Sequence, residues 1–283
     1  MNIVAPFRIV LLLLGLFACT SCSHADSGRA ITKVYGQSAG VPTDQLSLDI
    51  YPAPKQAAPV VVYVHGGAWR TGDKANVHGK ADFFTRNGYQ FVSINYRLEP
   101  APPYPGNVQD VAAAIAWVHK FIDQYGGNPD QIFLMGHSAG AHLVALAMTD
   151  QAFIKRYGLA TRHIQAMALL DGASYDVAAS MEHRGRDEAA VRAFGTNPEI
   201  WKRASPIAHL GGGKRIPPTL VVGIGKSPVR TKWHQAFYSA LKRNGHAAKY
   251  FEARGQSHGS LNKTFGQSSN PATEAVLQFF AQN

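Results

Sequence analysis

Cysteine is scarce in this sequence of 283 residues, and the two that occur, Cys19 and Cys22, lie near the N-terminus. The chain after Cys22 can therefore form no internal disulfide bond and hold no metal ion through thiolates. Nothing else in the sequence implies a metal or a cofactor, so we expect none.

The chain also has no apolar stretch of the kind that crosses a bilayer, which takes about 20 residues. The apolar run Ile9–Ala18 is shorter, follows a single positive charge at Arg8, and is followed by small and polar residues. This order is typical of a secretory signal peptide. Residues 1–25 are therefore predicted to be an export signal.

Two cleavage sites are open within this signal. Leu16-Phe17-Ala18-Cys19 resembles a bacterial lipobox, in which cleavage before the cysteine leaves that residue lipidated. Ser23-His24-Ala25 offers an ordinary cleavage site instead, with small residues at its first and third positions. We predict an exported bacterial protein, periplasmic or an outer-membrane lipoprotein, that touches a membrane only through such an anchor.

Acidic residues are few: 18 Asp and Glu stand against 28 Lys and Arg, a formal net charge of +10. A basic excess can indicate nucleic-acid binding. Here the basic residues are spread along the chain and form no stripe, which favours a solvated basic surface and no nucleic-acid partner. Hydrophobic residues make up 46% of the chain, enough for a sizeable core.

Strand-like and helix-like segments alternate from Gln45 onwards. Short β-branched or alternating runs predict strands, and longer amphipathic or alanine-rich runs predict helices. The predicted strands are Gln45–Tyr51, Pro59–His65, Phe91–Tyr96, Gln131–Met135, Ile164–Leu170, Thr219–Gly223 and Ala248–Arg254, and the predicted helices are Asn76–Gly88, Val108–Tyr125, Ala139–Thr149, Lys232–Asn244 and Ala272–Ala281. This alternation implies an α/β fold with a mostly parallel sheet.

The same pattern divides the chain. Residues 26–44 are predicted to be a flexible segment, and residues 45–283 to form one domain. Between residues 172 and 213 the alternation lapses, which is consistent with a cap or lid over an active site. No boundary signal there supports a second full domain.

A nucleophile motif stands at Gly136-His137-Ser138-Ala139-Gly140, which fits G-x-S-x-G. It follows a predicted strand and precedes a predicted helix, the context that this motif requires. The serine must sit on a sharp turn with its hydroxyl exposed, and the flanking glycines leave room for neighbouring backbone. Ser138 is therefore predicted to be a nucleophile.

A glycine pair follows an earlier strand, in His65-Gly66-Gly67-Ala68-Trp69. By itself it could be a plain tight turn. With Ser138 downstream, we predict that the backbone N–H groups of Gly66, Gly67 and Ala139 form an oxyanion hole. Trp69 either lines the pocket or packs beneath it.

A general base is expected among the late histidines. His258 follows the last predicted strand, where a loop can bring its imidazole over the nucleophile. His246 precedes that strand and should lie at the opposite end of it. We therefore predict that His258 is the base.

From Gln45 to its end the chain resembles α/β-hydrolases of the HGGxW esterase group, close to feruloyl and acetyl-xylan esterases and to arylformamidases. The matching residues are Leu48-Asp49-Ile50-Tyr51, Tyr63–Trp69, Gly72-Asp73-Lys74, Asn95-Tyr96-Arg97-Leu98, Gly136–Gly140 and His258. The resemblance implies an α/β-hydrolase fold, with helices on both faces of a mostly parallel central sheet and a small cap. It also implies a structural role for Asn95-Tyr96-Arg97.

The sequence departs from that group at the third catalytic residue. The group usually carries an acid after the strand that corresponds to Thr219–Gly223, where this chain has Lys226. A cation there would oppose a protonated imidazole. Either the acid has moved to Asp171, at the end of Ile164–Leu170, or the protein is a weakened or non-catalytic relative. Asp171 could equally be a turn residue before a glycine, and Asp176 and Glu252 are weaker candidates for the acid.

Together these features predict a serine carboxylester hydrolase that works through an acyl-enzyme. The resemblance implies small acyl esters as substrates, such as acetyl or feruloyl esters of carbohydrate. Amide cleavage of the arylformamidase type and a non-catalytic ligand-binding homologue remain the alternatives.

Overall fold

The computed structural model describes residue 1 and residues 30–98, 104–172, 174–183 and 188–283. Residues 2–25 of the predicted export signal, with Cys19 and Cys22, lie outside the described residues. Residues 173 and 184–187 of the expected cap do so as well. Across the described ranges, no helix is long and apolar enough to cross a membrane.

One mostly parallel sheet organises the described chain. Its order is β1-β2-β4-β3-β5-β6-β7-β8, with antiparallel pairing of β1 to β2 and of β2 to β4 and parallel pairing elsewhere. The strands are β1 (Ile31–Val34), β2 (Ser47–Tyr51), β3 (Ala58–Val64), β4 (Gln90–Ile94), β5 (Gly127–His137), β6 (Ile164–Leu170), β7 (Thr219–Gly223) and β8 (Ala248–Glu252). The predicted α/β class is confirmed.

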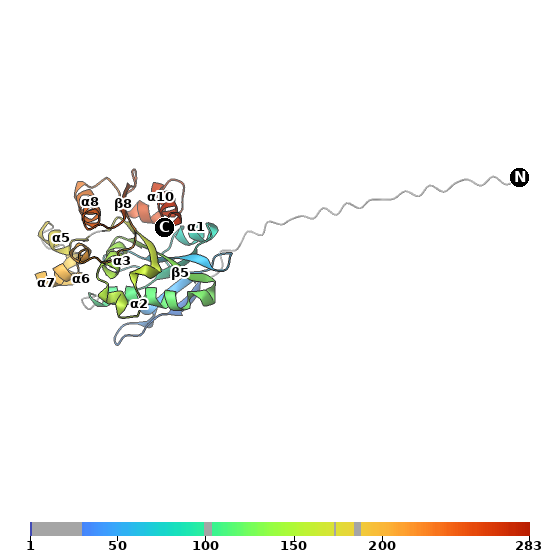
Figure 1. Ribbon diagram of the computed structural model, residues 1–283, viewed down its shortest axis with the longest axis horizontal. Helices are drawn as coiled ribbons and strands as arrows, with labels where there is room; N and C mark the ends of the chain where they lie inside the picture. The colour runs from blue at the N-terminus through green and yellow to red at the C-terminus, as the bar shows by residue number, and fades with distance from the viewer. Residues whose placement is uncertain (2–29, 99–103, 173, 184–187) are drawn as a thin grey trace.

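Helices cover both faces of this sheet, and Figure 1 shows α1 and α10 on one side and α2 on the other. The α-helices are α1 (Lys80–Arg86), α2 (Gly106–Phe121), α3 (Ala139–Thr149), α4 (Ala152–Lys155), α5 (Val177–His183), α6 (Glu188–Phe194), α7 (Pro198–Arg203), α8 (Pro228–Arg243), α9 (His258–Lys263) and α10 (Pro271–Ala281). Short 3₁₀ helices are η1 (Thr43–Leu46), η2 (Ile122–Tyr125), η3 (Thr161–His163) and η4 (Pro206–His209).

The central strands are buried on both faces, which explains their nearly continuous apolar sequence. In β3, Val62 and Val64 join the core formed with α2 and α3. Val61 and Tyr63 of the same strand join the second core, formed with α1 and α10. Successive strand residues point to opposite faces of the sheet, so β3 contributes side chains to both cores.

Two segments differ in type from the prediction. Residues 31–34, predicted to be flexible, form β1 and pair with residues 47–50 of β2. The segment has only four residues, and its side chains are largely exposed although Ile31 and Val34 are apolar. The strand is stabilised by pairing with β2 at the sheet edge. His258 does not lie in a loop but begins α9, whose N-terminus is capped by Ser257.

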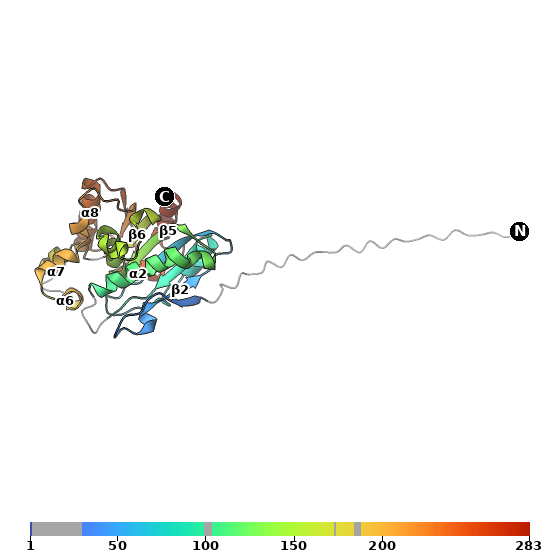
Figure 2. The same ribbon diagram turned by 60° about the horizontal axis from the view of Figure 1, so that its bottom comes forward.

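The connection between β6 and β7 lies outside the two layers of helices that cover the sheet. It carries α5, α6, α7 and η4. Figures 1 and 2 place α6 and α7 at one end of the molecule. Residues of α6 also border the pocket described next.

Candidate active site

Ser138 lies on the sharp turn between β5 and α3, as its motif predicts. Its backbone has φ 54° and ψ −119°, a strained conformation for a residue other than glycine. A Cβ on Gly136 would lie 2.5 Å from the carbonyl oxygen of Gly140, and one on Gly140 would lie 2.1 Å from that of Val64. Both glycines are therefore required by close backbone packing around the serine.

The glycine pair after β3 approaches this turn closely. A Cβ on Gly66 would lie 3.0 Å from Cβ of Ser138, so Gly66 packs against the serine. Gly67 has φ 126°, and a Cβ there would lie 1.9 Å from the carbonyl oxygen of Thr71. Ala68, which sequence reasoning did not select, has φ 52° and lines the pocket with Gly67. Ala139 begins α3, so its N–H has no partner within that helix.

A pocket of about 610 Å³ lies over this turn. Its lining combines the serine turn, the glycine loop, the start of α9 and α6: Gly67, Ala68, Arg70, Thr71, His137, Ser138, Glu188, Ala189, Arg192 and His258. No hydrogen bond joins Ser138 to His258 among the described residues. In free enzymes such bonds are often long and tighten only when substrate binds.

Trp69 packs beneath the pocket rather than lining it. Its side chain is buried, with the ring 4.9 Å from that of Phe194 and 5.4 Å from that of His142. Because Phe194 belongs to α6, Trp69 links the glycine loop to the helices between β6 and β7. This resolves the two roles that the sequence left open for Trp69.

His258 and Asp171 are brought together by the fold, although they lie 87 positions apart. Nδ1 of His258 is 2.5 Å from Oδ2 of Asp171. The Asp171 side chain is fully buried, at the carboxyl end of β6, while that of His258 is 41% exposed. The imidazole can thus face the pocket while its second nitrogen is held by a carboxylate.

The two weaker candidates for the acid, Asp176 and Glu252, have other partners. Asp176 accepts a hydrogen bond from the backbone N–H of Ala179 at the start of α5. Glu252 pairs with Arg254, 3.2 Å away. Lys226 is exposed in the loop after β7. Of the carboxylates considered from the sequence, Asp171 is the one that the structure places beside the imidazole.

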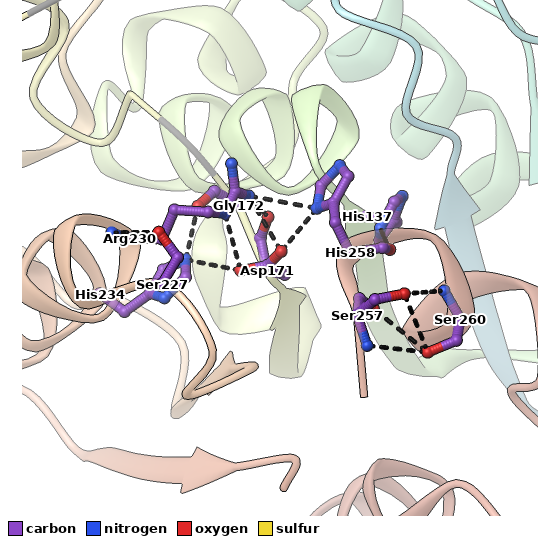
Figure 3. Close-up of polar contacts among 9 residues, drawn as sticks. All are labelled: His137, Asp171, Gly172, Ser227, Arg230, His234, Ser257, His258 and Ser260. Atoms are coloured by element: carbon purple, nitrogen blue, oxygen red, sulfur yellow. Dashed lines mark hydrogen bonds and ion pairs between the residues drawn. The ribbon is translucent and has the colours of Figure 1, made fainter. Parts of the chain in front are cut away.

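Two side chains of α8 complete the surroundings of Asp171, and sequence reasoning missed both (Figure 3). Nη2 of Arg230 lies 3.0 Å from Oδ2 of Asp171, and Nε2 of His234 lies 3.3 Å from Oδ1. Burial by itself would raise the pKa of Asp171, but the hydrogen bond with His258 and the charge of Arg230 outweigh it and leave that pKa lowered. Asp171 is therefore held as a carboxylate.

His137, the variable residue of the serine motif, packs against the ring of His258. Its ring centroid is 4.6 Å from that of His258, and its Nε2 lies 3.0 Å from the backbone oxygen of His258. Burial, reinforced by the charges of His258 and Lys80, lowers the pKa of His137 to about 3. The neutral ring can donate Nε2–H to that carbonyl and fix the start of α9. The other late histidine, His246, is not at the site, because its Nε2 lies 2.8 Å from the backbone oxygen of Leu210.

Lys80 ties α1 to α9. Its Nζ donates to the backbone oxygen of Asn262 at 2.7 Å and lies 5.0 Å from the centroid of the Tyr63 ring. Tyr63 in turn donates its hydroxyl hydrogen to Oδ1 of Asn262 at 2.8 Å. Burial lowers the pKa of Lys80 to about 7, because a buried ammonium is poorly solvated.

We predict a pH-dependent stability from Lys80. The folded-state pKa of about 7 is below the ordinary value of 10.5, so the unfolded chain binds more protons between these pH values. The free energy of unfolding should therefore rise with pH across that window, and Lys80→Met should show a smaller rise. Urea unfolding at several pH values measures this, with the exposed Lys263→Met as control. Parallel pH curves for wild type and Lys80→Met would contradict the prediction.

The family described as BD-FAE matches residues 48–229 of this chain. Esterase LipQ of Mycobacterium tuberculosis is 34% identical over 238 residues, covering 80% of this chain and 56% of that protein. Esterase LipC of the same organism is 30% identical over 253 residues, covering 81% and 59% respectively. The chain thus spans less than two thirds of the length of these relatives.

Solved structures share the fold. A truncated carbohydrate esterase from gut microbiota superposes with a TM-score of 0.72 at 21% identity, covering 91% of this chain and 98% of that one. An inhibited esterase B from Lactobacillus rhamnosis gives a TM-score of 0.71 at 22% identity, covering 89% and 87%. At such identities the likeness establishes the architecture alone.

Proposed function

Because the chain belongs to the BD-FAE family, within the α/β-hydrolase esterases, we propose that it is a serine carboxylester hydrolase. The observation that carries the proposal is the contact of 2.5 Å between His258 Nδ1 and the buried carboxylate of Asp171. A non-catalytic homologue would have no need of a buried acid against the histidine that shares a pocket with Ser138.

The proposed reaction proceeds through an acyl-enzyme. Nε2 of His258 accepts the hydroxyl proton of Ser138 while Oγ attacks the carbonyl carbon of the ester. Asp171 keeps the proton of the neutral imidazole on Nδ1 and stabilises the imidazolium. That imidazolium protonates the leaving alcohol as the intermediate collapses. Water, deprotonated by His258, then attacks the acyl-enzyme and releases the acid and free Ser138.

The negative oxygen of the intermediate needs hydrogen-bond donors. We assign this role to the backbone N–H groups of Gly67, Ala68 and Ala139, each of which would contribute about 3 kcal/mol in the transition state. The close packing of Gly66 against Ser138 supports a packing role for this predicted donor and favours Ala68 in its place. No cofactor takes part in this scheme.

The proposed substrates are small acyl esters, including acetyl or feruloyl esters of carbohydrate. A pocket of about 610 Å³ is large enough for a small acyl group with part of its alcohol. One solved structure of the same fold is described as a carbohydrate esterase. The named relatives are described as esterases, which favours ester over amide cleavage.

A direct experiment tests the function. Protein lacking residues 1–25 is offered p-nitrophenyl acetate, methyl ferulate and acetylated xylan, beside the Ser138→Ala variant. The proposal requires hydrolysis by the wild type and its loss in the variant. Equal rates for the two proteins would refute it.

We also propose that the protein is exported and anchored through Cys19. The supporting features are the charged start, the apolar run Ile9–Ala18 and the lipobox-like residues before Cys19. In bacterial cells labelled with radioactive palmitate, the full-length protein should incorporate label and Cys19→Ala should not. Cys22→Ala is the matched control. Export without label in the wild type would indicate the ordinary cleavage site at Ser23-His24-Ala25.

A further inference from the structure

The loop and helix after β7 depart most from the pattern of the resembled esterases. The position of their usual acid is occupied here by Lys226, which is exposed. Four residues later, in the first turn of α8, Arg230 turns inward instead and reaches the acid that β6 supplies.

Arg230 contacts Asp171 at both its side chain and its main chain. Nη2 lies 3.0 Å from Oδ2 and 2.6 Å from the backbone oxygen of Asp171, and Nε lies 3.2 Å from Oδ1. Asp171 itself has φ 43°, a conformation that residues other than glycine rarely adopt. A guanidinium, with its planar set of donors, can hold both parts of one residue.

His234 assists from the next turn of α8. Nε2 of His234 lies 2.6 Å from the backbone oxygen of Gly172 and 3.3 Å from Oδ1 of Asp171. Burial lowers the pKa of His234, more strongly than Asp171 raises it, so the ring is neutral and donates from Nε2. Figure 3 shows Arg230 and His234, both from α8, contacting Asp171, with a further contact from Arg230 to His258.

The same guanidinium also approaches the base. Nη2 of Arg230 lies 3.2 Å from Nδ1 of His258, whereas Oδ2 of Asp171 lies 2.5 Å from it. If Nδ1 carried no proton, Arg230 would donate to it, and the proton on Nε2 would prevent the ring from accepting one from Ser138. The shorter contact with Asp171 favours the proton on Nδ1, the tautomer that a general base needs.

We propose that Arg230 is a positioning residue for the reaction, an inference that rests on the proposed function. Arg230 fixes the carboxylate of Asp171 in the orientation that keeps the Nδ1 proton on His258. In this protein the segment after β7 thus supplies the cation that holds a relocated acid, in place of the acid itself. Its positive charge also lowers the pKa of Asp171 and so helps to keep that residue a carboxylate.

Two variants separate orientation from charge. Arg230→Met removes the positive charge and the hydrogen-bond donors. Arg230→Lys keeps a positive charge but cannot hold the carboxylate and the backbone oxygen of Asp171 together. We expect kcat to fall about 100-fold in both, since small displacements of catalytic groups cost about that much, with KM little changed. The acidic limb of the pH profile should move to higher pH in Arg230→Met alone, because the charge of Arg230 lowers the pKa of Asp171 and a neutral side chain does not.

Other groups around His258 do not obscure this comparison. The charge of Arg230 lowers the pKa of Asp171 and that of His234, and Arg230→Lys keeps a charge that acts on both, while His137, with a pKa of about 3, stays neutral over the working range. Lys80, with a pKa of about 7, titrates within that range but equally in every variant. Arg243→Met removes an exposed arginine at the other end of α8 and should behave as wild type.

Ser138→Ala, measured in parallel, distinguishes the two hypotheses. Full activity in Ser138→Ala would refute the proposed function. A loss there, with kcat and pH profile unchanged in folded Arg230→Met, would overturn the role of Arg230 alone. A fall in kcat with identical pH profiles in all variants would mean that Arg230 has a purely structural role. That result would also overturn the inference. If Arg230→Met does not fold, wild-type kcat in Arg230→Lys would overturn the inference.

Discussion

Replacing Ser138 with alanine is expected to lower kcat for p-nitrophenyl acetate by about 10⁶-fold, the loss seen when a triad serine is removed. Alanine has no nucleophilic atom, so no acyl-enzyme can form, and only the oxyanion donors and the pocket remain. The variant should fold as wild type does. Alanine fits the same turn and keeps the backbone strain at φ 54°.

Steady-state rates and covalent labelling by a fluorophosphonate both measure this loss. The wild type should lose activity in step with the incorporation of one label, and Ser138→Ala should incorporate none. Ser268→Ala, an exposed serine in the turn before α10, is the matched control. Labelling of Ser138→Ala at the wild-type rate would show that another residue is the nucleophile.

Replacing Asp171 with asparagine is expected to lower kcat by about 10⁴-fold, as in a triad whose acid becomes an amide. Asparagine has nearly the same shape, but its amide can donate to Nδ1 of His258. The imidazole would then carry its proton on Nε2 and could not accept one from Ser138. KM should change little, since Asp171 is fully buried and is not expected to contact substrate.

The same substitution should also destabilise the fold. It leaves the Arg230 guanidinium, 3.0 Å away and largely buried, without its countercharge. Breaking a buried ion pair costs about 3–5 kcal/mol. Activity must therefore be measured below the melting transition of the variant, with circular dichroism at the same temperature.

Matched acid variants make the result specific. Asp176→Asn and Glu252→Gln alter carboxylates that do not contact His258 and should retain wild-type kcat. Lys226→Asp should not raise turnover, because Nδ1 of His258 is already held by Asp171. A strong gain from Lys226→Asp, with wild-type rates in Asp171→Asn, would mean that the enzyme lacks a working acid.

The serine turn could be recognised from sequence because its requirements are local. A buried strand, two close-packed glycines and a following helix all lie within residues 127–149. The acid could not be chosen in this way. An aspartate before Gly172 is equally suited to a turn, and only the packed sheet shows its side chain buried against His258.

The residues around the acid were missed for a related reason. The sequence predicted a helix from Lys232, but α8 begins at Pro228, after the cap Ser227. Arg230 therefore lies outside the predicted helix. The burial of Lys80 could not be predicted from sequence either, because a lysine in a helix is usually exposed. Here Lys80 is buried against α9.

The sequence by itself thus determined the α/β class, the serine turn and the choice of His258, because each depends on neighbouring residues and on strand order. Tertiary structure alone decided that Asp171 meets His258 and that Arg230 and His234 hold Asp171. Those contacts join the ends of β6, α8 and α9, which are segments far apart in the chain. Burial and neighbouring charges at that place determine which side chains are ionised.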